Sequence, residues 1–223
     1  MRHATDADHV VAVSTIVSRE RTLRAAAPIG ILWGIGHTLT IMSVGGAIIL
    51  FGIVIPPRLG LGMEMCVALM LVLLGALNLA TAVREAPAVA GMRRPDGGHI
   101  HSRAGEKWRQ ARLGGSLRPL GVGVVHGLAG SAAVALLVLG TIRDRGWGVA
   151  YLVVFGVGTI AGMLVITTAL ALPVVVVAGR FEQLRRLLGT VTGLASVGFG
   201  VFLVHEIGFV HGLFTGHPEW VPQ

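Results

Sequence analysis

The feature that most constrains this chain is a series of apolar stretches that are long enough to cross a membrane. A helix needs roughly 20 apolar residues to span the hydrocarbon core of a bilayer. The stretches that meet this length are Ala27–Ile55, Gly62–Val83, Pro119–Ile142, Gly148–Gly179 and Leu188–Val204. Charged residues make up only 13% of the chain, about half the share usual in a soluble domain. We therefore expect an all-α polytopic membrane protein embedded in a lipid bilayer.

The opening apolar segment is an exception to this pattern. Residues Val10–Ser18 would form only about 13 Å of helix, which is too short to cross alone. Either the protein begins with a half-helix, or an upstream apolar stretch has been lost, and we favour the second reading. Counted as a truncated first crossing, this segment brings the expected total to about six transmembrane helices.

Positive charges gather in three of the polar segments between the apolar stretches. Their members are Arg19, Arg21 and Arg24; Arg84, Arg93, Arg94, Arg103, Lys107, Arg109, Arg112 and Arg118; and Arg180, Arg185 and Arg186. Cytoplasmic loops carry such an excess of Lys and Arg. We therefore expect the 84–118 linker in the cytoplasm and the protein in the cytoplasmic (inner) membrane. The net charge of +7 is explained by these loops, so no nucleic-acid partner is expected.

Two short patterns recur along the chain. Gly34–Thr38 is echoed by Gly156–Thr159, and His3 with Asp8 five residues later is echoed by His126 with Ser131. Many transporters consist of two oppositely oriented halves around a site at the middle of the membrane. We expect one permease domain, residues 1–223, with a 3+3 inverted repeat whose halves are joined by the 84–118 linker.

The start of the chain carries four ionisable residues within seven positions, His3, Asp6, Asp8 and His9. Each costs roughly 2.5–3.5 kcal/mol inside a membrane, and imidazole with carboxylate is a transition-metal ligand set. On a straight helix His3, Asp6 and His9 share one stripe, whereas Asp8 projects away from it. Capping of a helix that begins near Ala7 would explain one aspartate, but it would not explain the histidines. The cluster therefore predicts a metal site.

Two further histidines, His37 and His126, lie within long apolar stretches. An ionisable group inside a membrane is a candidate site residue by default, so we add both to the predicted metal site. The histidines of the linker (His99 and His101) and of the tail (His205, His211 and His217) are assigned to solvated or interfacial segments instead. The single cysteine, Cys66, excludes a thiol–disulfide oxidoreductase, which needs two.

Within RHATDADHVVAVSTIVSRE, the H-x4-D-H pattern of His3, Asp8 and His9 resembles the signature of the nickel/cobalt transporter family. Gly36-His37-Thr38 resembles that family's second motif, and Gly123–Ala132 resembles its shorter six-helix branch, associated with urease accessory nickel permeases. Members carry an apolar half-helix before the signature, which is why we expect truncation. The later acidic motifs of the eight-helix members are absent. The resemblance implies that His3, Asp8, His9 and His37 recognise Ni(II) or Co(II).

The sequence thus predicts a permease for Ni(II), with Co(II) second, that works in uptake, is not an enzyme and has no tightly bound cofactor. His3 and His9 would supply nitrogen ligands, Asp8 would neutralise charge, and Asp6 would act at the entrance or beyond the direct ligands. His37 would add a ligand from the next helix. Binding should weaken in acid because the ligands become protonated. Nickel-enzyme maturation proteins are candidate partners.

Two other classes of function remain open from the sequence. An exporter of excess metal would use the same cluster, whereas an exporter of small organic solutes would not need it. A non-transporting accessory or sensor protein would bind the metal without moving it.

Overall fold

The structure is a computed structural model that describes residues 6–18, 20, 22–52, 55–85, 117–128, 141–142, 144–178, 182–215 and 217–220. All regular secondary structure in these residues is helical, and short turns and irregular segments connect the helices. The helices are α1 (Ala7–Val17), α2 (Leu23–Phe51), α3 (Pro57–Glu85), a helix of residues 117–126, α6 (Arg145–Pro173) and α7 (Glu182–His205). Two five-residue π-helical turns, η3 (Val174–Ala178) and η4 (Glu206–Val210), follow α6 and α7. The chain is an all-α polytopic membrane protein, as predicted.

Among the residues that the structure describes, four helices are long and apolar enough to cross a membrane, with candidate spans at Leu23–Phe51, Pro57–Val83, Arg145–Val176 and Arg186–Val210. Large apolar side chains point outward from them; Leu73 is 58% exposed and Val154 is 72% exposed. An outward-facing apolar surface of this kind suits lipid rather than water. The predicted spans matched these helices to within a few residues at most ends.

Helix boundaries follow local chemistry. The Thr22 side chain accepts a hydrogen bond from the Ala25 amide at the start of α2, and Asp144 accepts one from the Trp147 amide at the start of α6. These are N-cap bonds that satisfy otherwise unpaired amides of a first turn. Helix α6 ends at Pro173, and the wider turns of η3 begin directly after it.

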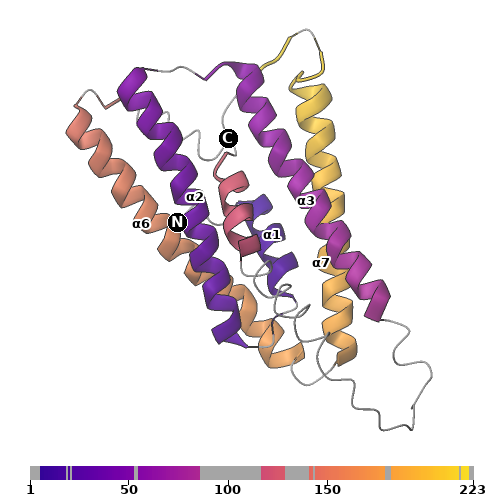
Figure 1. Cartoon of the computed structure of the whole chain (residues 1–223). Coiled ribbons are helices and arrows are strands. Elements are labelled where there is room, and N and C mark those ends of the chain that lie inside the picture. The colour runs from indigo at the N-terminus through magenta and orange to yellow at the C-terminus, as the bar shows by residue number, and fades with distance from the viewer. Residues whose placement is uncertain are drawn as a thin grey trace, which may run out of the picture.

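The four long helices form two pairs. Helix α2 packs along α6, and α3 packs along α7, while α1 lies between the pairs and contacts α3, α6 and α7 (Figure 1). Small residues allow the close approach within each pair. A Cβ atom on Gly34 would lie 2.7 Å from the Ile160 Cα of α6, and one on Gly75 would lie 2.6 Å from the Gly193 carbonyl oxygen of α7. Such glycine contacts are typical of helices packed in lipid.

Helix α1 is 11 residues long and ends among polar groups of the α3–α7 pair. The side-chain nitrogen Nδ2 of Asn78 lies 3.3 Å from the Thr15 carbonyl oxygen of α1 and 3.0 Å from the Gly189 carbonyl oxygen of α7. The Thr15 hydroxyl also donates to the Thr192 carbonyl oxygen, at 3.2 Å. These bonds fix the end of α1 that is remote from Asp8 and His9. The prediction that the opening segment is shorter than a crossing is confirmed.

Several sequence predictions fall outside the described residues. His3, most of the 84–118 linker with His99 and His101, and residues 129–140 of the expected Pro119–Ile142 span are among them. The total of six crossings and the cytoplasmic placement of the linker stay predictions. The proposed repeat also stays a prediction, although its two glycine-rich echoes prove to be neighbours, since Thr38 donates to the Gly156 carbonyl oxygen at 3.2 Å.

Candidate metal centre

The first turn of α1 carries two of the predicted ligands, Asp8 and His9. The helix begins at Ala7 with Asp6 in the N-cap position, and the Asp6 side chain makes no capping hydrogen bond. The start near Ala7 is therefore as predicted, but the capping bond that was the alternative explanation for the aspartates is not made by Asp6. Unpaired amides give a helix N-terminus a partial positive charge. A carboxylate such as Asp8 is favoured in this first turn.

His126 comes to the same place from a helix far away in the sequence. It is the last residue of the 117–126 helix, which lies beside α1 in the middle of the bundle (Figure 1). This helix sits against α2 by backbone contact, because a Cβ atom on Gly123 would collide with the Trp33 carbonyl oxygen. The Thr40 hydroxyl adds a bond to the Val124 carbonyl oxygen, at 2.9 Å. The position of His126 is thus set by close contacts between its helix and α2.

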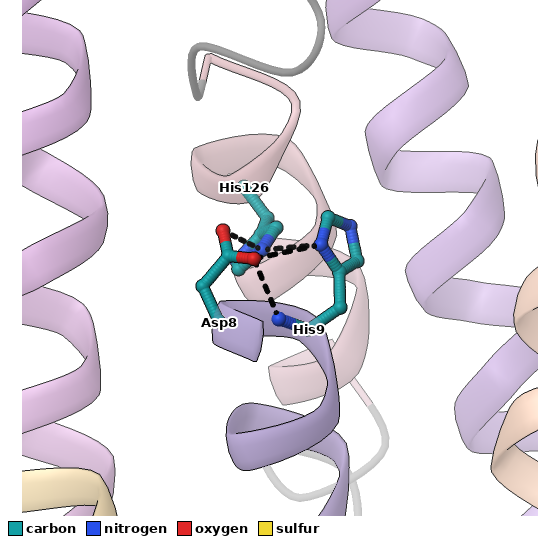
Figure 2. Close-up of side chains that lie close together, drawn as sticks. All are labelled: Asp8, His9 and His126. Atoms are coloured by element: carbon teal, nitrogen blue, oxygen red, sulfur yellow. Dashed lines mark hydrogen bonds and ion pairs between the residues drawn. The ribbon is translucent and has the colours of Figure 1, made fainter. Parts of the chain in front are cut away.

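The three side chains Asp8, His9 and His126 meet in one compact group (Figure 2). His126 Nε2 lies 2.9 Å from Asp8 Oδ2 and 3.1 Å from His9 Nδ1. His9 Nδ1 lies 3.3 Å from Asp8 Oδ1, which also accepts a 2.9 Å bond from the His9 amide. Both imidazoles are fully buried, and the Asp8 side chain is 18% exposed. We call these three residues the central cluster.

Helix α2 adds two rings beside the central cluster. His37 is fully buried, and its ring centroid lies 5.6 Å from that of His9 and 6.5 Å from that of His126. Trp33, one turn earlier and also fully buried, lies 5.4 Å from the His126 ring and stacks on His9 at 6.2 Å. Four aromatic rings from three helices therefore surround one point of the bundle interior.

The structure brings together most, but not all, of the predicted site residues. Asp8, His9 and His126 form the central cluster, and His37 lies next to it. Asp6 is at the N-cap, close enough to act electrostatically on His9, whereas His3 lies outside the described residues. Asp8 was expected to project away from the stripe that includes His9, but its Oδ1 lies only 3.3 Å from His9 Nδ1. The expectation considered only the positions of residues on a straight helix. In the structure the Asp8 carboxylate turns toward the ring of His9 and also contacts His126 from the 117–126 helix.

Trp33 was missed by sequence reasoning. The signal was present, because Trp33 lies one helical turn before His37 and so shares its face of α2. Its Nε1 has no hydrogen-bond partner among the residues that the structure describes, which is uncommon for a buried indole.

The donor atoms of the central cluster are suited to a transition-metal ion. They comprise two imidazole nitrogens and one carboxylate, and one such atom from each residue lies within 4.8 Å of the others. Imidazole suits Ni, Cu, Zn and Fe, and a carboxylate contributes a negative charge that offsets the charge of a cation. A buried carboxylate is costly in a low-dielectric interior unless it is compensated. The cluster could therefore hold a divalent ion.

The fold and this site together define a class, namely a polytopic helical membrane protein with a buried histidine–carboxylate cluster. Comparison with curated proteins then finds the urease accessory protein UreH of Bacillus sp. (strain TB-90), with 32% identity over 214 residues, which cover 96% of this chain and 90% of the relative. The chain belongs to the family of this urease accessory protein. No model of a protein family matches the chain, and no solved structure matches it significantly.

Proposed function

We propose that the protein transports Ni(II), and Co(II) as a second substrate, across the cytoplasmic membrane, and that the central cluster with His37 binds the ion on its way. The observation that carries this proposal is the spacing of the donor atoms. Two ligands bound to one ion at about 2.1 Å and at right angles lie about 3 Å apart. The two imidazole nitrogens are 3.1 Å apart, and each lies near a different oxygen of the Asp8 carboxylate, His126 Nε2 at 2.9 Å from Oδ2 and His9 Nδ1 at 3.3 Å from Oδ1, which is close to this value.

The location of the cluster favours transport over permanent storage. Its residues come from the N-terminal turn of α1 and from the 117–126 helix, both inside the bundle between two pairs of long helices (Figure 1). Transporters commonly form their ion site from short or broken helices at the interface of two halves. The buried Trp33 Nε1 could donate a hydrogen bond to a water molecule that remains on a partly dehydrated ion.

The choice of nickel rests on the sequence resemblance and on the relative. The relative is named a urease accessory protein, and the pattern of His3, Asp8 and His9 resembles that of nickel and cobalt transporters. Affinity order alone would favour Cu(II) over Ni(II), so geometry or supply must provide selectivity. A role in delivering nickel to the maturation of a nickel enzyme follows from the same two observations.

The test is uptake of radioactive nickel into vesicles that contain the purified protein, with Co(II), Cu(II) and Zn(II) as competitors. Wild-type protein should accumulate nickel. Asp8→Asn and His126→Ala should each reduce the uptake at least tenfold, because the loss of a contact at a metal site typically costs about 10- to 100-fold. His205→Ala, at an exposed position of α7, is the matched control and should behave as wild type.

Equilibrium dialysis of the detergent-solubilised protein separates binding from transport. Binding without uptake would indicate an accessory or sensor protein, and loss of accumulated metal from loaded vesicles would indicate an exporter. Wild-type uptake by both cluster variants would contradict the proposed site.

A further inference from the structure

The segment after α7 folds back over the beginning of α3. Its turns are closed by hydrogen bonds from the Leu213 amide to the Ile207 carbonyl (3.2 Å) and from the Glu219 amide to the His211 carbonyl (3.0 Å). Ile207 is buried against Leu61 of α3 in an apolar cluster that also includes Trp220. We call the described residues 206–215 and 217–220 the tail; it lies at the end of the bundle where α3 begins and α7 ends (Figure 1).

Trp220 attaches the tail to one acidic residue of α3. Its Nε1 donates a 2.9 Å hydrogen bond to Glu64 Oε1. The indole lies directly on Gly60, one turn earlier, where a Cβ atom would collide with the ring. Glu64 is the only acidic residue in the apolar span Pro57–Val83, and it is partly buried. A carboxylate inside a membrane span is costly and is usually functional.

Glu64 lies on a helix that contacts both the tail and the helix of the central cluster. Its carboxylate accepts the bond from Trp220 of the tail, and α3 also packs against η4 and against α1, whose first turn carries Asp8. Glu64 therefore lies on the element that connects the tail with α1. Holding the tail does not require a negative charge, because a neutral amide oxygen would accept the same bond from the indole.

We propose that Glu64 is a positioning residue for the cation. Its carboxylate draws the ion from the tail end of the bundle toward Asp8, and Trp220 holds the carboxylate in place. The inference rests on the proposed transport function and adds an approach route to it. A fixed negative charge beside a low-dielectric path raises the local concentration of cations. Glu64 would act through its charge, whereas Trp220 would act by fixing the carboxylate.

The test compares two variants that separate charge from attachment. Glu64→Gln keeps an acceptor for Trp220 but removes the charge, and Trp220→Phe keeps the charge but removes the hydrogen bond. Initial rates of nickel uptake into vesicles are measured against nickel concentration at low and high salt. Glu219→Gln is the matched control, because it removes a carboxylate from an exposed position of the same tail.

We expect Glu64→Gln to raise the KM for nickel about fivefold, with a much smaller change in the maximal rate, and to weaken the dependence of KM on salt. Trp220→Phe should change KM less, and Glu219→Gln should not change it. Equilibrium binding of nickel at the central cluster should persist in all three variants, which shows that they are folded.

Two results would overturn the inference alone. One is a wild-type KM and salt dependence for Glu64→Gln while wild-type protein transports nickel. The other is impairment of Trp220→Phe with normal Glu64→Gln, which would make the contact a purely structural attachment. If wild-type protein neither binds nor transports nickel, the proposed function fails first and the route falls with it.

Discussion

The two helix pairs have similar packing but contribute differently to the site. Both are joined by glycine contacts, at Gly34 in the α2–α6 pair and at Gly75 in the α3–α7 pair. The α2–α6 pair presents the rings of Trp33 and His37 to the central cluster. The α3–α7 pair instead holds the far end of α1 through the Asn78 side-chain amide, which donates to the Thr15 carbonyl oxygen, and the Thr192 carbonyl oxygen, which accepts from the Thr15 hydroxyl.

This difference indicates that the two helix pairs have different roles. One pair contributes side chains to the candidate metal centre, and the other fixes the short helix that carries Asp8 and His9. Substitutions in the first pair should alter metal affinity, whereas substitutions in the second should mainly alter stability.

The largest effect is expected for His37→Ala. Loss of a buried imidazole beside the cluster should weaken nickel binding at least tenfold, while the fold is kept. Titration of the purified protein with Ni(II) measures the change, and Leu39→Ala, at a lipid-facing position of α2 that is 53% exposed, is the control. An unchanged affinity would show that His37 only packs, and that the α2–α6 pair does not shape the site.

A comparison of glycines tests the same difference through sterics. Gly123→Ala would push the 117–126 helix away from the Trp33 carbonyl, and Gly75→Ala would push α3 away from α7. Each should cost about 1–3 kcal/mol of stability, as overpacking does, but only Gly123→Ala should also weaken metal binding. Gly121→Ala is a control on the same helix, because nothing lies within 4 Å of its added carbon. Equal effects on affinity from both packed positions would contradict the comparison.

Asn78→Leu should reduce the stability of the protein more than its affinity for nickel. It removes the amide that bridges α1 and α7, at a cost of about 1–2 kcal/mol by analogy with hydrogen bonds between membrane helices. Thermal unfolding in detergent should therefore shift more than nickel affinity does. Thr81→Val, whose hydroxyl bonds only to its own helix in the described contacts, provides the baseline. A tenfold loss of affinity without loss of stability would place Asn78 in the binding site instead.

The smallest effect concerns Glu20, in the connection between α1 and α2. Burial raises the pKa of this carboxyl above its ordinary value. The folded protein then holds the proton more tightly than the unfolded chain, so stability falls as pH rises through the folded pKa. Glu20→Gln should stabilise the protein slightly at pH 7, by less than about 1 kcal/mol, and this gain should vanish near pH 4. A larger gain at pH 4 than at pH 7 would reverse the sign of the argument.

Much of the fold follows from the sequence because lipid imposes a simple length rule on apolar helices. The spans around His37, Asn78 and Thr159 could be placed from composition alone. Their pairing could not, since glycine-rich faces fit several neighbours about equally well. The similarity between Gly34–Thr38 and Gly156–Thr159 was one basis for the predicted repeat. The structure shows that these two segments are in contact.

The site was predictable in its residue types but not in its geometry. His9 and His37 stood out because ionisable groups are rare in apolar surroundings. The meeting of Asp8 with His126 depends on a tertiary contact that a helical wheel does not contain. Glu64 was overlooked, although a single carboxylate in an otherwise apolar span is the same kind of signal.

The contacts among Asp8, His9 and His126 have a consequence for the proposed transport. An ion that binds there would have to displace these hydrogen bonds before the nitrogen and oxygen lone pairs could coordinate it, so part of the binding free energy would be used to break them. When the ion leaves, the same hydrogen bonds would re-form and favour its release. Such a ligand set would bind a cation less tightly than its donor atoms alone permit, as a transporter requires.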